Sequence, residues 1–165
     1  RLSIEMHYNE AGEQRMFLDG EDVSEAIRMP EISICASDVS SLPAVRSFLL
    51  EMQRKLAREH NVVMDGRDIG TVVLPDADLK IFLTASAEQR AKRRMLELEA
   101  KGVDASFDEV LKDIEYRDDQ DTKRAAAPLR AAEDAVRVDT SSLNFEESAA
   151  VLAGLVIDRL SPKQE

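Results

Sequence analysis

The chain has 165 residues, 44% of them apolar and 33% charged, which predicts one globular domain with at most a small additional lobe. Its 33 acidic and 22 basic residues give a formal net charge of −11, which argues against a protein that binds nucleic acid through its overall charge. The single cysteine, Cys35, excludes an internal disulfide, no Cys/His spacing is typical of a zinc site, and no run of about 18 apolar residues predicts a membrane span. An anionic ligand would therefore need a local cluster of Arg side chains.

The first 40 residues carry the pattern of a small antiparallel sheet followed by a helix. Apolar and polar residues alternate over 2–8 and 13–18, which predicts two strands joined by a hairpin loop at 9–12. The dipeptide at 19–20, Asp-Gly, predicts a second turn. Apolar residues spaced at i, i+3, i+4 and i+7 then predict a short helix over 31–40.

From residue 60 onward, predicted strands alternate with predicted helices. Short apolar runs at 61–66, 79–84 and 135–139 predict three strands, the first of them buried. This order of strands and helices indicates a layered α/β fold with a parallel sheet.

Each predicted helix has its own start signal. Pro43 stands in the first turn of a helix whose apolar stripe continues to Leu56. A capping residue followed three positions later by Gln or Glu occurs at Ser86, Ser106 and Asn144, so we expect a helix to begin after each of these residues.

The segment 65–70 reads DGRDIG and follows the predicted strand at 61–66 directly. Parallel α/β folds bind ligands at the carboxyl ends of their strands. Arg67 can meet a phosphate there with two parallel N–H donors, and Asp68 can accept a hydrogen bond from an amino or hydroxyl group. A surface turn with an Asp–Arg pair fits the same residues, and the spacing alone does not separate the two interpretations.

A second polar segment, 117–124, reads RDDQDTKR. Arg117, Asp121 and Arg124 fall at i, i+4 and i+7 and continue an apolar stripe that begins at Val110. A helix face that changes from apolar to charged predicts a helix leaving the core to line a cleft, where Arg would bind phosphate. The alternative is Asp–Arg pairing on a solvated helix face.

A third group of basic residues, Arg90, Arg93 and Arg94, shares one face of the predicted helix after Ser86. Such a patch in an acidic protein fits a polyphosphate, although an ordinary basic surface that pairs with Glu97 explains the pattern equally well. None of the six glycines is followed by Lys, so the sequence contains no G-x-x-x-x-G-K-[ST] loop for ATP phosphates. The residues alone predict an α/β domain with a cleft for an anionic ligand.

Together, these segments resemble bacterial cytidylate kinase, the CMP/dCMP kinase branch of the nucleoside monophosphate (NMP) kinases. The resemblance rests on 65–77, on 80–86 with the Arg-rich helix that follows, on 117–129 and on 18–28. It covers nearly the whole chain, and the combination is far more specific than any one segment.

The resemblance implies transfer of the ATP γ-phosphoryl group to CMP or dCMP, with Mg²⁺ bound together with ATP and no protein-bound metal. It implies a cytoplasmic monomer whose partners are ATP, CMP and dCMP, with no nucleic acid and no membrane. The alternative hypothesis is a module that binds CMP without catalysis.

The resemblance also assigns roles, residue by residue. Residues that read the cytosine are Ser37, Arg46 and Asp68. Residues that hold the acceptor phosphate and sugar are Arg67, Arg117, Asp121 and Arg124, the three arginines being the catalytic residues. Residues on the ATP side are Arg90, Arg93 and Arg94. The carboxylate of Asp68 suits the exocyclic amino group of cytosine, where uracil presents a carbonyl oxygen instead.

The fold implied is an NMP-kinase-like, three-layer parallel sheet with a small antiparallel β insert lobe. The implied parts are 1–40 as the NMP-binding insert lobe, 41–103 and 126–165 as the α/β core, and 104–125 as a lid segment within that core. The family's P-loop strand would lie between the strands at 61–66 and 79–84, and the sequence contains no match to it. The resemblance therefore predicts a partial sheet and a chain that is inactive by itself.

Overall fold

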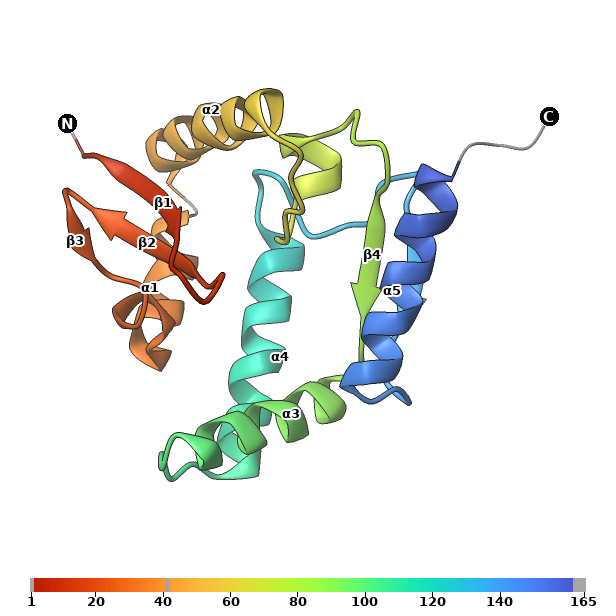
Figure 1. Cartoon of the computed structure of the whole chain (residues 1–165). Helices are drawn as coiled ribbons and strands as arrows, with labels where there is room; N and C mark the ends of the chain where they lie inside the picture. The colour runs from red at the N-terminus through yellow and green to blue at the C-terminus, as the bar shows by residue number, and fades with distance from the viewer. Residues whose placement is uncertain (1, 41, 162–165) are drawn as a thin grey trace. The chain divides into compact units, whose positions relative to one another are not determined.

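The computed structural model describes residues 2–40 and 42–161, without the side chains of residues 30, 31, 33, 34 and 37. The chain forms two units that meet in sequence between Phe48 and Leu49. The first unit contains β1 (Ile4–Tyr8), β2 (Gln14–Leu18), β3 (Glu21–Asp22), η1 (Ala26–Arg28), α1 (Pro30–Ser40) and the start of α2 (Pro43–Glu59). The second contains the rest of α2, η2 (Ile69–Val73), β4 (Ile81–Thr84), α3 (Ala87–Ala100), α4 (Phe107–Lys123), β5 (Val136–Asp139) and α5 (Phe145–Leu160), as drawn in Figure 1.

The first unit confirms the predicted antiparallel sheet. Strands β1 and β2 pair with Ile4 opposite Leu18, and the short β3 extends the sheet beside β2. Gly12 and Gly20 sit in the two connecting turns with φ values of 78° and 86°, a backbone region that glycine enters without strain. Helices α1 and α2 occupy the ranges predicted from residues 31–40 and from Pro43.

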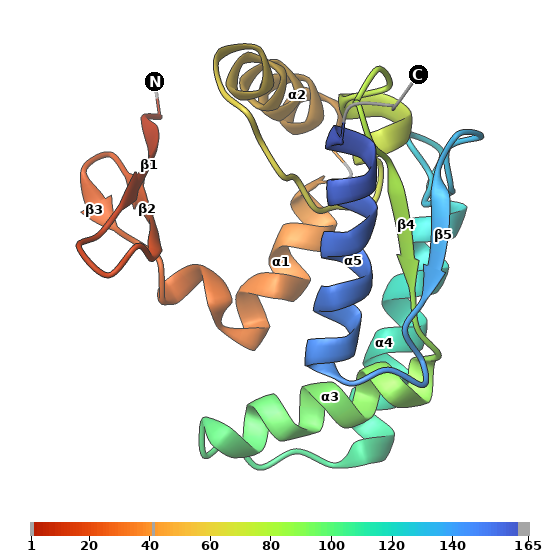
Figure 2. The ribbon, with the colours of Figure 1, turned by 45° about the vertical axis from the view of Figure 1, so that its right-hand side comes forward.

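The second unit has a two-stranded parallel sheet in place of the larger sheet that the sequence predicts. Strands β4 and β5 pair in parallel, with Ile81 opposite Val136, and lie side by side in Figure 2. The strand predicted at 61–66 is wrong: this segment pairs with no strand, and Val63 is fully exposed. An apolar run becomes a strand only where a neighbouring strand accepts its backbone hydrogen bonds, and the described residues offer none beside 61–66.

A short π-helix, η2, follows the DGRD residues directly, although no sequence signal predicted it. The carbonyl oxygen of Asp68 accepts hydrogen bonds from the N–H groups of Val72 at 2.9 Å and Val73 at 3.2 Å. Arg54 of α2 donates to the carbonyl oxygens of Val72 at 2.9 Å and Val73 at 3.1 Å, which satisfies acceptors that the end of a helix leaves free. The turn that carries Asp68 is thereby fixed from both sides.

The apolar core of the second unit lies between α3 and α4. Its buried members are Ala91, Leu98 and Val110, and the half-buried side chains packed on them are Met95, Ala105, Phe107, Leu111 and Ile114. The caps predicted from sequence are confirmed: the side chains of Ser86, Ser106 and Asn144 each accept a hydrogen bond from the N–H group three residues later. In the part of the chain that the structure describes, no helix is both long and apolar enough to cross a bilayer.

Helix α5 runs beside the two parallel strands (Figures 1 and 2). Arginine side chains bind the chain at both ends of this helix. Arg93 of α3 donates to the carbonyl oxygens of Thr140 and Leu143, just ahead of the helix. At the other end, Arg159 donates to the carbonyl oxygen of Asp78 at 2.7 Å. These contacts hold α5 in place where apolar packing on the sheet is sparse.

Candidate functional site

Four charged side chains from segments far apart in the sequence meet beside the end of α4. Arg67 Nε donates to Asp121 Oδ2 at 2.8 Å. Arg124 lies between two carboxylates, with Nη1 3.5 Å from Asp121 Oδ1 and Nη2 3.5 Å from Asp68 Oδ1. The side chains of Asp68, Asp121 and Arg124 are 12–15% exposed and so largely shielded from water, whereas the Arg67 side chain is 46% exposed. The structure thus brings the DGRDIG segment and the polar end of α4 into one site.

Backbone contacts just after α4 hold this cluster in position. The carbonyl oxygen of Asp121 accepts from the N–H group of Leu129 at 2.8 Å, so the chain turns back on the helix. Arg124 donates through Nε to the carbonyl oxygen of Ala127 at 2.6 Å, and Ala127 adopts a left-handed φ of 52°. The conformation of this turn therefore keeps the forked end of the Arg124 guanidinium directed at the two carboxylates.

Two guanidinium nitrogens of the site are buried without a hydrogen bond to any described residue, and the contact of Arg124 Nη2 with Asp68 is a 3.5 Å ion pair. Arg117 Nε and Arg124 Nη2 have no hydrogen-bond partner among the described residues. A buried donor that is left unpaired costs free energy, and such groups call for a specific explanation. Guanidinium groups bind phosphate and carboxylate through parallel N–H donors, so an oxyanion would satisfy both atoms. The arrangement is suited to holding a phosphate group.

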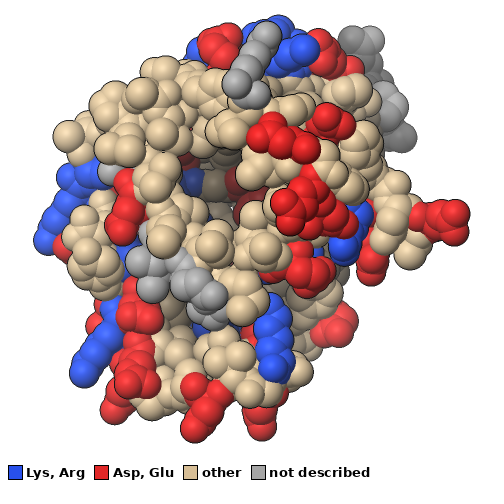
Figure 3. Space-filling view, turned by 90° about the vertical axis from the view of Figure 1, so that its left-hand side faces the viewer, with Lys and Arg blue, Asp and Glu red and all other residues tan. Residues whose placement is uncertain are grey.

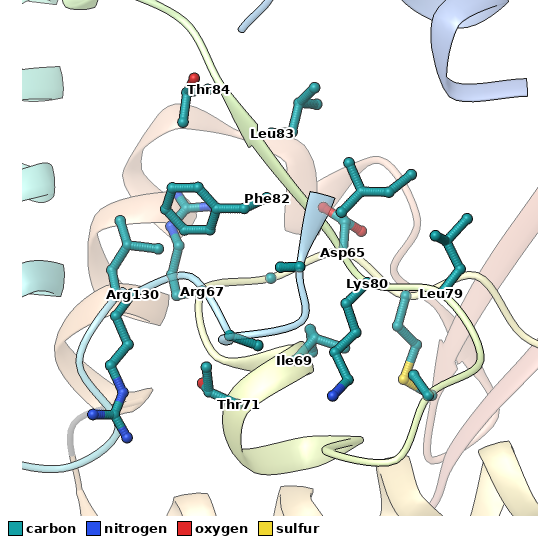
Figure 4. A pocket seen from close by; sticks show the side chains of 18 of the residues that line it. Asp65, Arg67, Ile69, Thr71, Leu79, Lys80, Phe82, Leu83, Thr84 and Arg130 are labelled. Carbon is teal, nitrogen blue, oxygen red and sulfur yellow. The ribbon is translucent and has the colours of Figure 1, made fainter. Parts of the chain in front are cut away.

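A cavity of about 720 Å³ lies next to this cluster in the second unit (Figure 4). Its walls come from residues 63–67, from β4 and the residues beside it, from the start of α3, and from Leu152, Ala153 and Val156 of α5. Strand β4 pairs with β5 along one edge, and no strand among residues 2–40 and 42–161 pairs with its other edge. The cavity therefore adjoins the edge of β4 that has no partner strand among the described residues.

Basic and acidic side chains occur together in the cavity wall. Lys80 lines the cavity, and its Nζ donates to both oxygens of Asp134, which is not among the lining residues, at 2.8 and 2.9 Å. This pairing lowers the pKa of the Asp134 carboxyl. Arg67, Arg130 and Asp65 also line the cavity, as Figure 4 shows. Among the described residues, no three His, Cys, Asp or Glu side chains gather as a metal site.

The three arginines of α3 have different surroundings. Arg90 lines the cavity and binds both oxygens of Asp118, and these hydrogen bonds raise the pKa of Arg90. Arg93 is engaged by backbone oxygens before α5, and Arg94 pairs with Glu97 at 2.9 Å on the helix surface. Of the three, only Arg90 is among the residues that line the cavity.

The remaining predicted residues belong to the first unit. Arg46 lies in α2, where Nη1 donates to the carbonyl oxygen of Ser40 at 3.3 Å. Ser37 lies in α1, and its side chain is outside the described part of the chain. The roles predicted for these two residues stay predictions.

Sequence reasoning missed Asp118 and Arg54. Asp118 belongs to the RDDQDTKR segment, and its side chain faces Arg90 on α3. It lies four residues after Ile114, which packs against α3, so both residues are on the same face of α4. Arg54 gave no signal, because an arginine on an amphipathic helix more often faces water than caps another helix. On the face drawn in Figure 3, Lys and Arg side chains stand singly or in small groups among Asp and Glu side chains.

Comparison with known proteins places the chain in a family. Residues 2–156 match the family model for cytidylate kinase. The chain is 58% identical over 136 residues to a cytidylate kinase of Caldicellulosiruptor bescii, covering 82% of this chain and 60% of that protein. It is 52% identical over 143 residues to a cytidylate kinase of Carboxydothermus hydrogenoformans, covering 87% and 64%. It is also 52% identical over 147 residues to a cytidylate kinase of Pseudomonas syringae pv. tomato, covering 88% and 64%.

The chain spans about 60% to 64% of the length of these curated relatives. The family model, in contrast, covers nearly all of the 165 residues, including every charged residue of the site. The chain belongs to the cytidylate kinase family.

Proposed function

We propose that the chain forms the acceptor-binding part of an enzyme that transfers the γ-phosphoryl group of ATP to CMP or dCMP. The observation that carries the proposal is a pair of buried donors that make no hydrogen bond within the described part of the chain, Arg117 Nε and Arg124 Nη2, beside the Arg67–Asp121 pair. A nucleoside monophosphate offers the dianionic group that these donors lack. The chain's membership of the cytidylate kinase family supports cytidylate as the acceptor.

Within this proposal, Arg67, Arg117 and Arg124 bind the acceptor phosphate, and Asp121 aligns Arg67 and Arg124 while it accepts from the sugar. Asp68 accepts a hydrogen bond from the amino group of cytosine, and Ser37 and Arg46 complete the reading of the base. Asp68 suits this role because its side chain is 12% exposed, so a uracil carbonyl would face a shielded carboxylate without a donor.

In phosphoryl transfer the protein itself takes little part in covalent chemistry. It requires in-line placement of the two nucleotides, neutralisation of the charge on the transferred group and exclusion of water. Three guanidinium groups supply the neutralisation, and residues 104–125 act as a lid that brings Arg117 and Arg124 onto the acceptor. Residues 1–40 form the NMP-binding lobe, and residues 41–103 and 126–165 form the core.

We infer that the phosphate-binding loop for ATP comes from sequence outside these 165 residues, with a strand that pairs with the open edge of β4. Two observations support this. The sequence contains no G-x-x-x-x-G-K-[ST] motif. The cavity of about 720 Å³ is lined by β4 and also by Arg67 and Arg90. Mg²⁺ would arrive with ATP and neutralise its phosphates. The enzyme would act as a cytoplasmic monomer on small nucleotides.

ADP formation tests this proposal. The 165-residue chain, mixed with ATP, Mg²⁺ and CMP, is expected to form no ADP. A longer chain, in which a segment with a phosphate-binding loop and its strand precedes Arg1, is expected to form ADP with CMP or dCMP at least about tenfold faster than with UMP. Equal rates with CMP and UMP in the longer chain would contradict the proposal. Binding of CMP with no turnover in that chain would favour the alternative, a module that binds the nucleotide without catalysis.

A further inference from the structure

The helices α3 and α4 are joined in two different ways along their length. The apolar cluster of Ala91, Leu98 and Val110 holds the first half of α4. The second half, which carries Arg117, Asp121 and Arg124, has no apolar residue in that buried cluster. Its orientation therefore depends on polar contacts.

The contact that joins this second half of α4 to α3 is the Arg90–Asp118 pair. Arg90 Nη1 donates to Asp118 Oδ1 at 2.8 Å, and Nη2 donates to Oδ2, so the two groups form a bidentate pair. Among the described residues it is the only ion pair between the two helices. Arg90 Nε also donates to the carbonyl oxygen of Ala85, the residue after β4, at 3.0 Å. One guanidinium group thus links the end of β4 to α4.

We propose that Asp118 is a positioning residue: through Arg90 it holds the last turns of α4 against the carboxyl end of β4, so that Arg117, Asp121 and Arg124 are in place for the acceptor phosphate. This inference rests on the proposed function. Asp118 directly follows Arg117 and lies three residues before Asp121, so a small rotation of this part of the helix moves both. Both members of the pair line the cavity, which places the link at the site itself.

The Arg90–Asp118 pair contributes more to the orientation of α4 than to the free energy of unfolding. The side chains of Arg90 and Asp118 are 36% and 38% exposed, and ion pairs this accessible contribute little to the free energy of unfolding. The bidentate geometry, in contrast, fixes both the distance and the plane of the two groups. Loss of Asp118 should therefore loosen the end of α4 while the apolar cluster keeps the helix folded.

The test compares Asp118→Asn with Asp119→Asn in the 165-residue chain. Asp119 is the next residue and pairs with Lys123 at 2.6 Å on the exposed side of α4, so its variant removes the same charge from the same helix. Two quantities are measured: amide hydrogen exchange along α4, and CMP affinity by calorimetry. Asp118→Asn is expected to speed exchange over 116–124 and to weaken CMP binding, each by about fivefold, and to leave 107–113 unchanged. Asp119→Asn is expected to change neither quantity.

A double variant, Arg90→Gln with Asp118→Asn, is expected to bind CMP no more weakly than the weaker single variant, because the two residues act as one unit. Equal exchange and affinity in Asp118→Asn and Asp119→Asn would overturn the inference. So would a loss of CMP affinity in Asp118→Asn without faster exchange, because Asp118 would then act on the ligand directly. A wild-type chain that does not bind CMP would remove the proposed function, and the exchange data would still decide whether Asp118 holds α4 in place.

Discussion

Replacing Arg124 by Ala is expected to weaken CMP binding by the chain about 30- to 150-fold, because a lost charge-assisted hydrogen-bond pair costs roughly 2–3 kcal/mol. Arg124 Nη2 is buried without a hydrogen bond to the residues that the structure describes, and Nη2 and Nη1 lie 3.5 Å from carboxylate oxygens of Asp68 and Asp121, respectively. Arg124→Lys keeps the charge but loses the fork of donors, so it should recover only part of the affinity. Titration calorimetry with CMP measures the three affinities.

The matched control for this variant is Lys123→Ala. Lys123 is the neighbouring cation, its side chain is 74% exposed, and it pairs with Asp119 away from the cluster. Its removal should leave CMP affinity within about twofold of the wild type, since an exposed pair contributes little. If Arg124→Ala bound CMP as tightly as Lys123→Ala does, Arg124 would have no part in binding the acceptor phosphate.

Replacing Asp68 by Asn is expected to abolish most of the preference for CMP over UMP. An amide can accept from the cytosine amino group and can also donate to the uracil carbonyl, whereas a carboxylate can only accept. The ratio of CMP to UMP affinity should fall by about tenfold or more, mainly through tighter binding of UMP. Competition between the two nucleotides for the chain measures the ratio directly.

Asp76→Asn serves as the control for Asp68→Asn. Asp76 is exposed just beyond η2, on the same stretch of chain, and it has no side-chain partner among the described residues. Its variant should keep the wild-type ratio. An unchanged ratio in Asp68→Asn would show that the base is read elsewhere, and Arg46 would be the next residue to test.

Local signals in the sequence predicted the parts of the fold that depend on local chemistry. The glycines at 12 and 20, the caps at Ser86 and Ser106 and the alternation over 2–8 each act within a few residues, and each prediction is confirmed. The strand at 61–66 depends on a neighbour far away in sequence. The apolar composition of 61–66 is typical of a strand. Without a neighbouring strand among the described residues, however, its backbone N–H and C=O groups have no hydrogen-bond partners, so no strand forms.

The site could be predicted only in part, for a similar reason. Spacing placed Arg117, Asp121 and Arg124 on one face of a helix, which fits a solvated surface as well as a cleft. The resemblance to the family decided between the two, and the structure adds the bond from Arg67 to Asp121 across 54 residues of chain. Spacing from Ile114 indicates that Asp118 faces α3, but its partner Arg90 could not be predicted, because that pairing is fixed by how the two helices pack.

The most direct test of the central claim is calorimetric titration of the wild-type chain with CMP, cytidine and UMP. Cytidine lacks the phosphate that Arg67, Arg117 and Arg124 are proposed to hold, and UMP lacks the amino group that Asp68 is proposed to accept from. The account predicts that CMP binds at least about tenfold more tightly than either of the other two. Equal affinities for CMP and cytidine would contradict it, because the three arginines would then not form a phosphate site.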